Sequence, residues 1–267
     1  MSGKIEIAGN RHMETLGNCG GYYSCPKDAN GRRLGPLVGY AGKYEAPDGK
    51  MLQFVGDIYA NFSKAEIHPS VLGFFAVSLC QRLYSQIGLD KIDGGVIGAP
   101  IGGYSLADAI GLAYPALGIT ILKAEKKVTR LATEELREQS KLVFARHDIE
   151  PGRNYVIVED VCNNFSTTEE LIRLIQSLGG RVLAIACFLN RSLVVNETFP
   201  VTDQMQDGPG TLTNHIPVIS LVRLPINEWR QDDPAVAEDI AKGNVILKPK
   251  NEWARLMEAM SEHPVLE

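Results

Sequence analysis

One stretch of sequence decides the fold of this chain: Tyr155-Val156-Ile157-Val158-Glu159-Asp160-Val161-Cys162-Asn163-Asn164-Phe165-Ser166-Thr167-Thr168. Its apolar start is rich in β-branched side chains and predicts a strand buried on both faces, as in a parallel sheet. Ser166 and Glu169 have the spacing of a capping box, so a helix is predicted over 167–178. The two acids therefore stand at the carboxyl end of a strand, facing a helix N-terminus.

Such a strand end forms a receptor with two parts. Carboxylates can hold ribose hydroxyls or a hydrated Mg²⁺, and the backbone N–H groups at a helix N-terminus can hold a phosphate. The ligand that suits both parts is a phosphorylated sugar. Taken alone, the stretch also fits an ordinary buried strand with an acidic cap.

The composition, 45% hydrophobic and 22% charged with a formal net charge of −5, is that of a soluble globular protein. This charge gives no global attraction to nucleic acid, so we expect no nucleic-acid partner. No apolar run approaches the roughly 18–20 residues of a membrane span, and the first residues lack the apolar core of a signal peptide. Five cysteines without a C-x-x-C pair predict free thiols in a reducing compartment. We therefore expect a cytoplasmic protein without a membrane partner.

Strands and helices are predicted to alternate along the centre of the chain. The predicted strands cover 94–98, 118–123, 141–145, 155–160, 181–189 and 216–221, and the predicted helices cover 69–88, 105–117 and 167–178. This order predicts an α/β fold with a parallel, doubly wound sheet. Ligands of such sheets bind outside the carboxyl ends of the strands. Glu159, Gly98–Gly103 and Lys123 fall at those ends, so we expect three segments to meet in one crevice.

The two ends of the chain are less regular. Two β-like arms at 37–44 and 51–59, joined by the turn Pro47-Asp48-Gly49, predict a hairpin near the N-terminus. The tail carries Trp229 and Trp253 and predicts a helical addition that covers an edge of the core.

The opening stretch resembles the phosphoribosyl-pyrophosphate (PRPP) motif of type I phosphoribosyltransferases, most closely the version common in orotate phosphoribosyltransferases. That motif has four hydrophobic residues, two acids, a short Thr/Gly loop and a Ser or Thr. The resemblance implies that Glu159 and Asp160 contact the ribose hydroxyls, directly or around Mg²⁺, and that Asp160 takes part in catalysis. It also implies a loop that wraps the 5′-phosphate: Asn163, Asn164, Phe165, Ser166 and Thr167.

The loop departs from the family pattern, which is usually Thr-Thr-Gly-Gly-Ser where this chain has Asn-Asn-Phe-Ser-Thr. Asparagine tolerates the left-handed backbone conformation, so we expect Asn164 to take the place of a glycine. Phe165 needs a separate place for its side chain. Glu169 and Glu170 in the first helical turn must point outward if a phosphate is to bind there.

A second resemblance lies in the segment Gly98-Ala99-Pro100-Ile101-Gly102-Gly103-Tyr104-Ser105-Leu106-Ala107. Glycines let a backbone approach an anion closely, and the helix that follows supplies its positive end. Turns of this composition between a strand and a helix are also common without any ligand. The segment is similar to the pyrophosphate loop of orotate phosphoribosyltransferases, with Ala99 and Pro100 in exchanged order. That resemblance implies four residues that bind pyrophosphate: Pro100, Ile101, Gly102 and Gly103.

The segment 121–130 carries four cations within eight residues. By itself this pattern is typical of a solvated charged face. In orotate phosphoribosyltransferases the corresponding segment opens a mobile loop, and Lys123 and Lys126 align with its two lysines, while Leu122 stands where the family has an arginine. The resemblance implies that both lysines are catalytic: they close over the leaving pyrophosphate, neutralise its charge and exclude water.

Arg191 follows the predicted strand 181–189 and corresponds to an arginine that, in the family, reaches the carboxylate of orotate. A guanidinium fork pairs well with a planar carboxylate, and an ordinary surface arginine is the alternative. Lys50 and Phe54 lie on the predicted N-terminal hairpin, where the family builds a hood over the base. The resemblance thus implies three base-binding residues: Arg191, Lys50 and Phe54.

The resemblance covers residues 40–225 and implies a type I phosphoribosyltransferase fold, with a central mostly parallel sheet flanked by helices. It also implies a single domain over 1–267. Within that domain the N-terminal hood covers 1–65, the core covers 66–225 and the C-terminal extension covers 226–267. The implied reaction transfers the 5-phosphoribosyl group of PRPP to orotate and releases pyrophosphate, with Mg²⁺ as cofactor, in a homodimer. Two alternatives stay open: transfer to another nucleobase, and a non-catalytic regulator that senses PRPP or a nucleotide.

Overall fold

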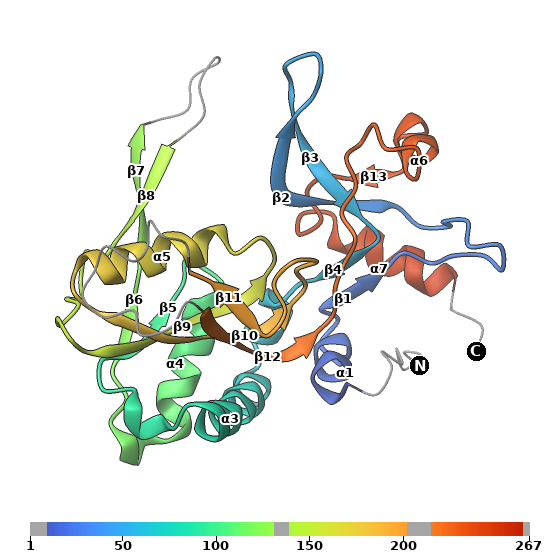
Figure 1. The fold of residues 1–267 in the computed structure, drawn as a ribbon. Helices are drawn as coiled ribbons and strands as arrows, with labels where there is room; N and C mark the ends of the chain where they lie inside the picture. The colour runs from blue at the N-terminus through green and yellow to red at the C-terminus, as the bar shows by residue number, and fades with distance from the viewer. Residues whose placement is uncertain (1–9, 131–138, 202–214, 264–267) are drawn as a thin grey trace. The chain divides into compact units, whose positions relative to one another are not determined.

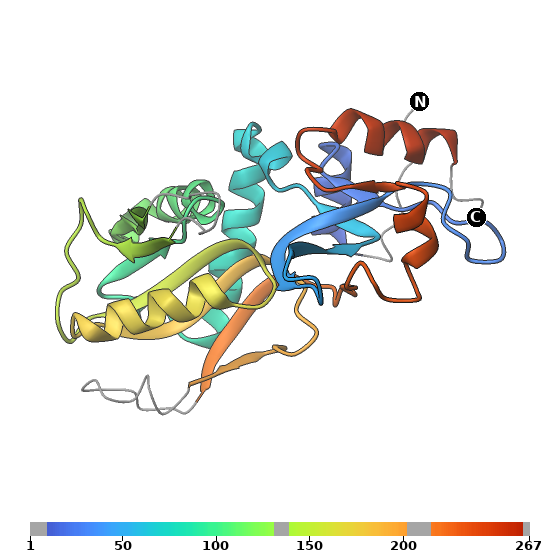
Figure 2. The same cartoon turned by 90° about the horizontal axis from the view of Figure 1, so that it is seen from above.

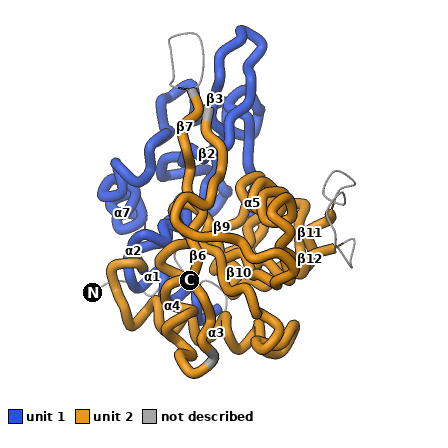
Figure 3. Tube along the Cα trace, turned by 90° about the vertical axis from the view of Figure 1, so that its left-hand side faces the viewer, with its two compact units in different colours: residues 1–65, 226–267 blue, residues 66–225 orange. Residues whose placement is uncertain are grey.

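The computed structural model describes three segments of the chain: residues 10–130, 139–201 and 215–263. The chain divides into two compact units, which Figure 3 shows in different colours. Unit 1 comprises Met1–Ala65 and Ile226–Glu267, and unit 2 comprises Glu66–Pro225.

The described residues of unit 2 form a six-stranded sheet (Figure 1). In spatial order the strands are β11 (Thr198–Pro200), β12 (His215–Arg223), β10 (Arg181–Asn190), β9 (Asn154–Cys162), β5 (Gly95–Gly98) and β6 (Ile121–Lys123). Neighbouring strands run parallel from β12 to β6, and β11 runs antiparallel to β12. The predicted α/β class with a mostly parallel sheet is confirmed.

Helices cover both faces of this sheet (Figures 1 and 2). On one face α3 (Pro69–Gln86) and α4 (Gly103–Ala113) pack against each other, and α5 (Ser166–Ser177) lies on the other face. The connections β5-α4-β6 and β9-α5-β10 progress across the sheet in opposite directions. Because such crossovers are right-handed, their helices fall on opposite faces.

Two short 3₁₀ turns complete unit 2 within the described segments: Leu89–Lys91 and Pro115–Leu117. The second turn occupies the end of the helix predicted over 105–117. α4 ends at Ala113 because Tyr114 precedes Pro115, and the residue before a proline is driven out of the helical region.

β9 lies in the middle of the sheet. It pairs with β10 on one side and with β5 on the other. Tyr155, Val156, Ile157 and Val158 are at most 1% exposed, because helices cover both faces of the strand. The strand that the apolar run predicted, buried on both faces, is confirmed.

The strand predicted at 141–145 lies outside this sheet. It is β8 (Gln139–Val143), which pairs antiparallel with β7 (Glu125–Arg130) in a separate hairpin. A central strand needs apolar residues on both faces, whereas β8 begins with Gln139, Ser140 and Lys141. The strand itself is confirmed, and its expected place in the parallel sheet was wrong.

Among the described residues, unit 1 has two small sheets. One pairs β1 (Tyr22–Ser24) with β4 (Ile58–Ala60). The other has the order β13 (Val245–Ile246), β2 (Leu37–Glu45) and β3 (Met51–Gly56). The predicted N-terminal hairpin is confirmed as β2 and β3.

The described helices of unit 1 come from both ends of the chain: α1 (Arg11–Asn18), α2 (Ser63–Glu66), α6 (Ala237–Ala241) and α7 (Trp253–Glu262). The C-terminal segment packs on the N-terminal residues of the same unit. Its Trp253 Nε1 donates a hydrogen bond to the Gly20 carbonyl at 2.8 Å, and Leu256 is fully buried. The predicted roles of the hood and of the extension stay predictions.

The described helices are short. α3 has 18 residues, and none of the helices in the described segments has the length and apolar character needed to cross a membrane.

A side chain of α5 attaches the β7–β8 hairpin to the rest of unit 2. Glu170 Oε1 accepts a hydrogen bond from the backbone N–H of Leu142 at 2.7 Å, on the outer edge of β8. The Leu142 side chain is itself buried in the core. The hairpin is therefore anchored at its base by one charged hydrogen bond and one apolar contact.

Glu170→Ala tests this anchor. The substitution removes the acceptor of the Leu142 N–H, and a hydrogen bond to a charged group contributes about 1.5–3 kcal/mol. We expect the Leu142 amide to exchange with deuterium about tenfold faster or more, measured by NMR on the full chain. Glu169→Ala is the matched control, because Glu169 pairs with Arg173 and should leave this amide unchanged. Equal exchange in Glu170→Ala and the wild type would contradict the contact.

Candidate functional site

The carboxyl ends of β5, β6 and β9 meet at one edge of the sheet. The strand register places Gly98 opposite Val158 on one side and opposite Lys123 on the other. The backbone continues this contact: the Ala99 N–H donates to the Val158 carbonyl at 2.9 Å, and the Ala124 N–H donates to the Gly98 carbonyl at 3.2 Å. The three segments expected in one crevice are therefore neighbours in unit 2.

The glycine loop runs directly against β9. A Cβ atom at Gly103 would lie 2.1 Å from the carbonyl oxygen of Val158, and one at Gly102 would lie 2.3 Å from the carboxylate of Asp160. A side chain at Gly103 would displace the backbone of β9, so glycine is required there, and a side chain at Gly102 would displace the Asp160 carboxylate. α4 begins at Gly103, and its positive N-terminal end thus lies beside Asp160.

The two acids of the opening stretch leave β9 on opposite faces, as successive residues of a strand do. Asp160 faces the glycine loop, and its Oδ1 also accepts a hydrogen bond from the Val161 N–H at 2.8 Å. Glu159 lies on the other face, and the charge of Lys126 on β7 lowers its pKa. The two acids therefore have different surroundings: Asp160 lies against the glycine loop, and Glu159 is influenced by the charge of Lys126.

Glu159 is an unusual carboxyl. Its Oε2 is buried and has no hydrogen-bond partner within the described segments. Burial raises the pKa of Glu159 well above its usual value, and the charge of Asp160 raises it further, whereas the Lys126 ammonium lowers it. A carboxyl whose pKa is shifted by burial and by specific charges is typical of a ligand-binding position.

Phe165, rather than Asn164, has the left-handed backbone conformation, with φ at 59° and ψ at 15°. The conformational prediction for Asn164 was wrong. The Phe165 side chain is 3% exposed and stacks on Phe199, with 5.5 Å between the ring centres. This packing holds Phe165 in a conformation that residues with a Cβ rarely adopt. A buried aromatic side chain therefore anchors the loop where the family has glycine.

The start of α5 differs from the predicted capping box. The helix begins at Ser166, and its N-cap Phe165 offers no side-chain cap. Asn164 Oδ1 accepts hydrogen bonds from the N–H of Ser166 at 3.2 Å and from its Oγ at 3.0 Å. Glu169 pairs with Arg173, one turn further along the helix. The capping box was therefore wrong, although the predicted helix is confirmed.

The predicted phosphate loop comprises the turn between β9 and α5 together with the first two residues of α5: Asn163, Asn164, Phe165, Ser166 and Thr167. Asn164 and Ser166 are exposed, and Asn163 and Thr167 are half-buried. The N–H groups in the first turn of a helix have no acceptor within the helix. The loop thus exposes polar atoms to solvent, while the Phe165 side chain is packed into the core.

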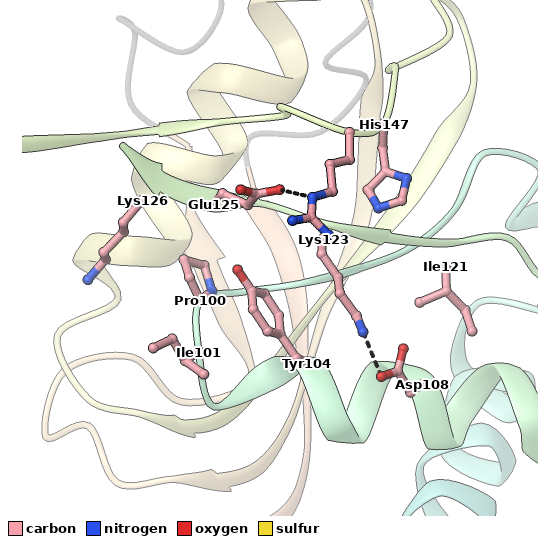
Figure 4. A pocket seen from close by; sticks show the side chains of 10 residues that line it. Pro100, Ile101, Tyr104, Asp108, Ile121, Lys123, Glu125, Lys126 and His147 are labelled. Atoms are coloured by element: carbon pink, nitrogen blue, oxygen red, sulfur yellow. Dashed lines mark hydrogen bonds and ion pairs between the residues drawn. The ribbon is translucent and has the colours of Figure 1, made fainter. Parts of the chain in front are cut away.

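The two predicted catalytic lysines have different surroundings. Lys123 Nζ lies 2.7 Å from Asp108 Oδ2 on α4 (Figure 4) and 5.6 Å from the centre of the Tyr104 ring. Lys126 lies on β7 and its charge acts on Glu159. Lys123 is therefore paired with the Asp108 carboxylate of α4, whereas the charge of Lys126 acts on Glu159.

A cavity of about 640 Å³ opens beside the glycine loop (Figure 4). Its walls contain glycine-loop residues, basic residues, two acids and one further apolar residue: Pro100, Ile101 and Tyr104; Lys123, Lys126, Arg146 and His147; Asp108 and Glu125; and Ile121. The peptide bond between Pro100 and Ile101 is cis. No motif in the sequence marks Arg146 and His147, which follow β8. Arg146 Nε lies 3.5 Å from Glu125 Oε1, so the return of the hairpin brings these residues to the cavity.

Arg191 lies directly after β10 and beside the end of β9, because its N–H donates to the Cys162 carbonyl at 2.9 Å. It is 8% exposed, so it is a buried arginine and not a surface one. Lys50 and Phe54 belong to unit 1. Lys50 lies in the exposed turn between β2 and β3, and the Phe54 ring lies 4.9 Å from that of Tyr44. The structure thus brings Arg191 together with the acidic stretch and places Lys50 and Phe54 in unit 1.

The described residues contain no group of three or more His, Cys, Asp or Glu side chains that could hold a metal ion. Mg²⁺ commonly binds through one or two carboxylates together with substrate phosphates and water. Glu159 and Asp160 offer such carboxylates at the end of β9. These residues fit a Mg²⁺ that arrives with a phosphorylated substrate and do not fit a metal cage made by protein alone.

Curated proteins similar to this chain are orotate phosphoribosyltransferases, and no family model matches it. It is 33% identical over 119 residues to the enzyme of Carboxydothermus hydrogenoformans, which is 44% of this chain and 55% of the relative. It is 24% identical over 194 residues to that of Caldanaerobacter subterraneus subsp. tengcongensis, which is 72% of this chain and 82% of the relative. The chain spans little more than half the length of the first of these relatives.

Solved structures overlap with the chain more widely and less closely. Orotate phosphoribosyltransferase from Aeropyrum pernix covers 86% of this chain and 98% of its own, with a TM-score of 0.45 and 16% identity. Adenine phosphoribosyltransferase from Trypanosoma brucei covers 78% of this chain and 79% of its own, with a TM-score of 0.46 and 15% identity. The resemblance to type I phosphoribosyltransferases is confirmed by the curated relatives. Among that class, the cited curated relatives are orotate enzymes by name.

The buried carboxyl of Glu159 gives a prediction about stability. A carboxyl with a raised pKa binds its proton more tightly in the folded than in the unfolded chain, so its contribution to stability falls as the pH rises above the ordinary glutamate pKa of about 4.3. Glu159→Gln removes the buried charge. We expect its melting temperature to rise by about 2–4 °C at pH 7.5, the shift for roughly 1 kcal/mol in a chain of this size, with no gain at pH 4.

Calorimetry on the full chain at the two pH values measures this effect. Glu169→Gln is the matched control, because that carboxylate belongs to a surface ion pair with Arg173, and such pairs contribute little. Its melting temperature should stay close to that of the wild type at both pH values. A Glu159→Gln variant less stable than the wild type at pH 7.5 would contradict the raised pKa.

Proposed function

We propose that this protein is a phosphoribosyltransferase that transfers the 5-phosphoribosyl group of PRPP to orotate, giving orotidine 5′-monophosphate and pyrophosphate. The contact between Gly102 and the Asp160 carboxylate carries this proposal, because it joins the segment suited to pyrophosphate with the acid suited to ribose. The similarity to curated orotate phosphoribosyltransferases supports the same reaction.

In the proposed reaction the bond between ribose C1 and a pyrophosphate oxygen breaks, and a bond forms between C1 and a ring nitrogen of orotate, whose proton leaves. Such a displacement passes through an oxocarbenium-like state, as in glycoside chemistry. Asp160 would hold a ribose hydroxyl next to the N-terminus of α4, which favours the pyrophosphate. Catalysis then comes from positioning and electrostatics, with no covalent nucleophile.

Lys126 would act on the leaving group, because it lines the cavity beside the glycine loop. Its ammonium would neutralise charge on pyrophosphate as the bond to C1 breaks. Lys123 would have to leave Asp108, which lies 2.7 Å away, to contribute in the same way. Mg²⁺ bound with PRPP would supply further charge neutralisation at the phosphates.

A PRPP- or nucleotide-sensing regulator on the same fold is the second candidate. Two observations favour it. The ion pair with Asp108 holds one predicted catalytic lysine, Lys123, at α4, and the buried Phe165 fills a loop position where the family has glycine. Such a protein would bind PRPP without turnover.

A steady-state assay with PRPP, Mg²⁺ and a panel of nucleobases separates the candidates. Turnover of orotate supports the proposed reaction. Turnover of another base alone, such as adenine, would assign a different acceptor. Binding of PRPP measured by calorimetry, with no turnover of any base, would overturn the enzyme and support the regulator.

We also propose that the protein works as a cytoplasmic homodimer, as the resemblance implies. Sedimentation velocity on the full chain tests the assembly. A species with the mass of a single chain at all concentrations measured would overturn the dimer.

Asp160→Asn should reduce kcat by at least about 100-fold, as the loss of one preorganised electrostatic group commonly does. The melting temperature should change little, because the amide has the shape of the acid. Asp93→Asn is the matched control: Asp93 accepts a hydrogen bond from the Asn154 N–H at 2.7 Å at the opposite end of β9. Its kcat should be that of the wild type. An unchanged kcat in Asp160→Asn would remove Asp160 from the mechanism.

Lys126→Ala should slow turnover about tenfold or more, because a charge that stabilises the leaving pyrophosphate is lost. Lys127→Ala is the control, since successive residues of β7 point to opposite faces of the hairpin. Initial rates in both directions of the reaction measure the effect. Equal rates for the two variants would make the segment a solvated charged face.

A further inference from the structure

Arg223 stands at the end of β12, outside every segment that the sequence singled out. Its Nη1 donates a hydrogen bond to the Asn190 carbonyl at 3.1 Å, and its Nη2 donates to the Ser192 carbonyl at 2.6 Å. Its Nε donates to Asn196 Oδ1 at 2.9 Å. The two carbonyls are those on either side of Arg191. A single planar guanidinium therefore holds the backbone of Arg191 from both sides.

The loop after β10 is also fixed from within by Asn190 and Ser192, which are both buried. Asn190 Oδ1 accepts a hydrogen bond from the Ser192 N–H at 3.1 Å. Asn190 Nδ2 donates to the carbonyls of Val195 and Asn196 at 3.1 and 2.9 Å. Ser192 Oγ accepts from the N–H groups of Val194 and Val195 at 3.2 and 3.1 Å. The loop is thus closed on itself by its own side chains.

The backbone of Arg191 connects this loop to the acidic stretch. Its N–H donates to the carbonyl of Cys162, the last residue of β9, at 2.9 Å. Cys162 stands two residues after Asp160 on the same strand. The Arg191 N–H is hydrogen-bonded to β9, and the carbonyls of the residues on either side of it accept hydrogen bonds from Arg223. These bonds fix the backbone position from which the Arg191 side chain extends.

We propose that Arg223 is a positioning residue that presets Arg191 for a planar base bearing a carboxylate. The inference rests on the proposed function, in which Arg191 binds the carboxylate of orotate. A binding residue that is already ordered loses less conformational freedom when its ligand arrives, so affinity for that ligand depends on the residues that order it. The proposed function assigns PRPP to Asp160 and the glycine loop, so its binding should be independent of Arg223.

Steady-state kinetics on the full chain test this role, with KM determined separately for orotate and for PRPP. Arg223→Ala should raise the KM for orotate about tenfold or more and leave the KM for PRPP within about twofold. Arg191→Ala should raise the KM for orotate at least as much. The double variant should be no worse than Arg191→Ala alone, because two residues that act through one contact are not additive.

Two further variants serve as controls for the positioning role. Arg223→Lys keeps the charge and a long side chain but lacks the fork that reaches both carbonyls, so its KM for orotate should lie between those of the wild type and Arg223→Ala. Arg153→Ala removes an arginine of the same unit that pairs with Asp93 and Glu150 at the opposite end of β9. Both of its KM values should equal those of the wild type.

The outcomes are distinguishable. Equal rises in the two KM values for Arg223→Ala, or effects of Arg223→Ala and Arg191→Ala that add in the double variant, would overturn the positioning role and leave the proposed reaction intact. A wild-type KM for orotate in Arg191→Ala would overturn the inference together with the predicted role of Arg191. Absence of orotate turnover in the wild type would overturn the proposed function itself.

Discussion

The close approach of the glycine loop to β9 is the constraint on which the rest of unit 2 depends. At Gly102 and Gly103 the chain passes from β5 into α4 within contact distance of Val158 and Asp160. That passage brings a helix N-terminus and a carboxylate to one point of the sheet edge. A side chain at Gly103 would separate the helix from the strand at which the other candidate residues gather.

Much of the fold was predictable because hydrophobic periodicity alone determines it. The apolar run before Glu159 predicted the central strand, and the apolar spacing from residue 69 predicted α3. The pairing partner of a short strand of mixed polarity could not be predicted in this way. The local pattern of β8 is compatible with a hairpin and with a parallel sheet, and the strand pairs with β7 in a hairpin. Strand ends were predictable for the same reason as strands, so the residues at the sheet edge were found.

The details of the site depend on tertiary contacts that no local pattern contains. Intrinsic preference favoured Asn164 for the left-handed conformation, but packing on Phe199 imposed it on Phe165. Arg146 reaches the cavity only because a hairpin returns to it. Arg223 reaches the loop after β10 because β12 pairs with that strand, 33 residues away in sequence at the point of contact.

The anchoring of Phe165 has a thermodynamic consequence for any phosphate that binds there. A glycine-rich loop is mobile before its ligand arrives, and glycine loses more conformational entropy on ordering than any other residue. In this chain the aromatic ring is already packed in the core, 3% exposed, so the loop loses that entropy when the protein folds. Phosphate binding at this loop is then a matter of contact enthalpy and desolvation, with little backbone left to order.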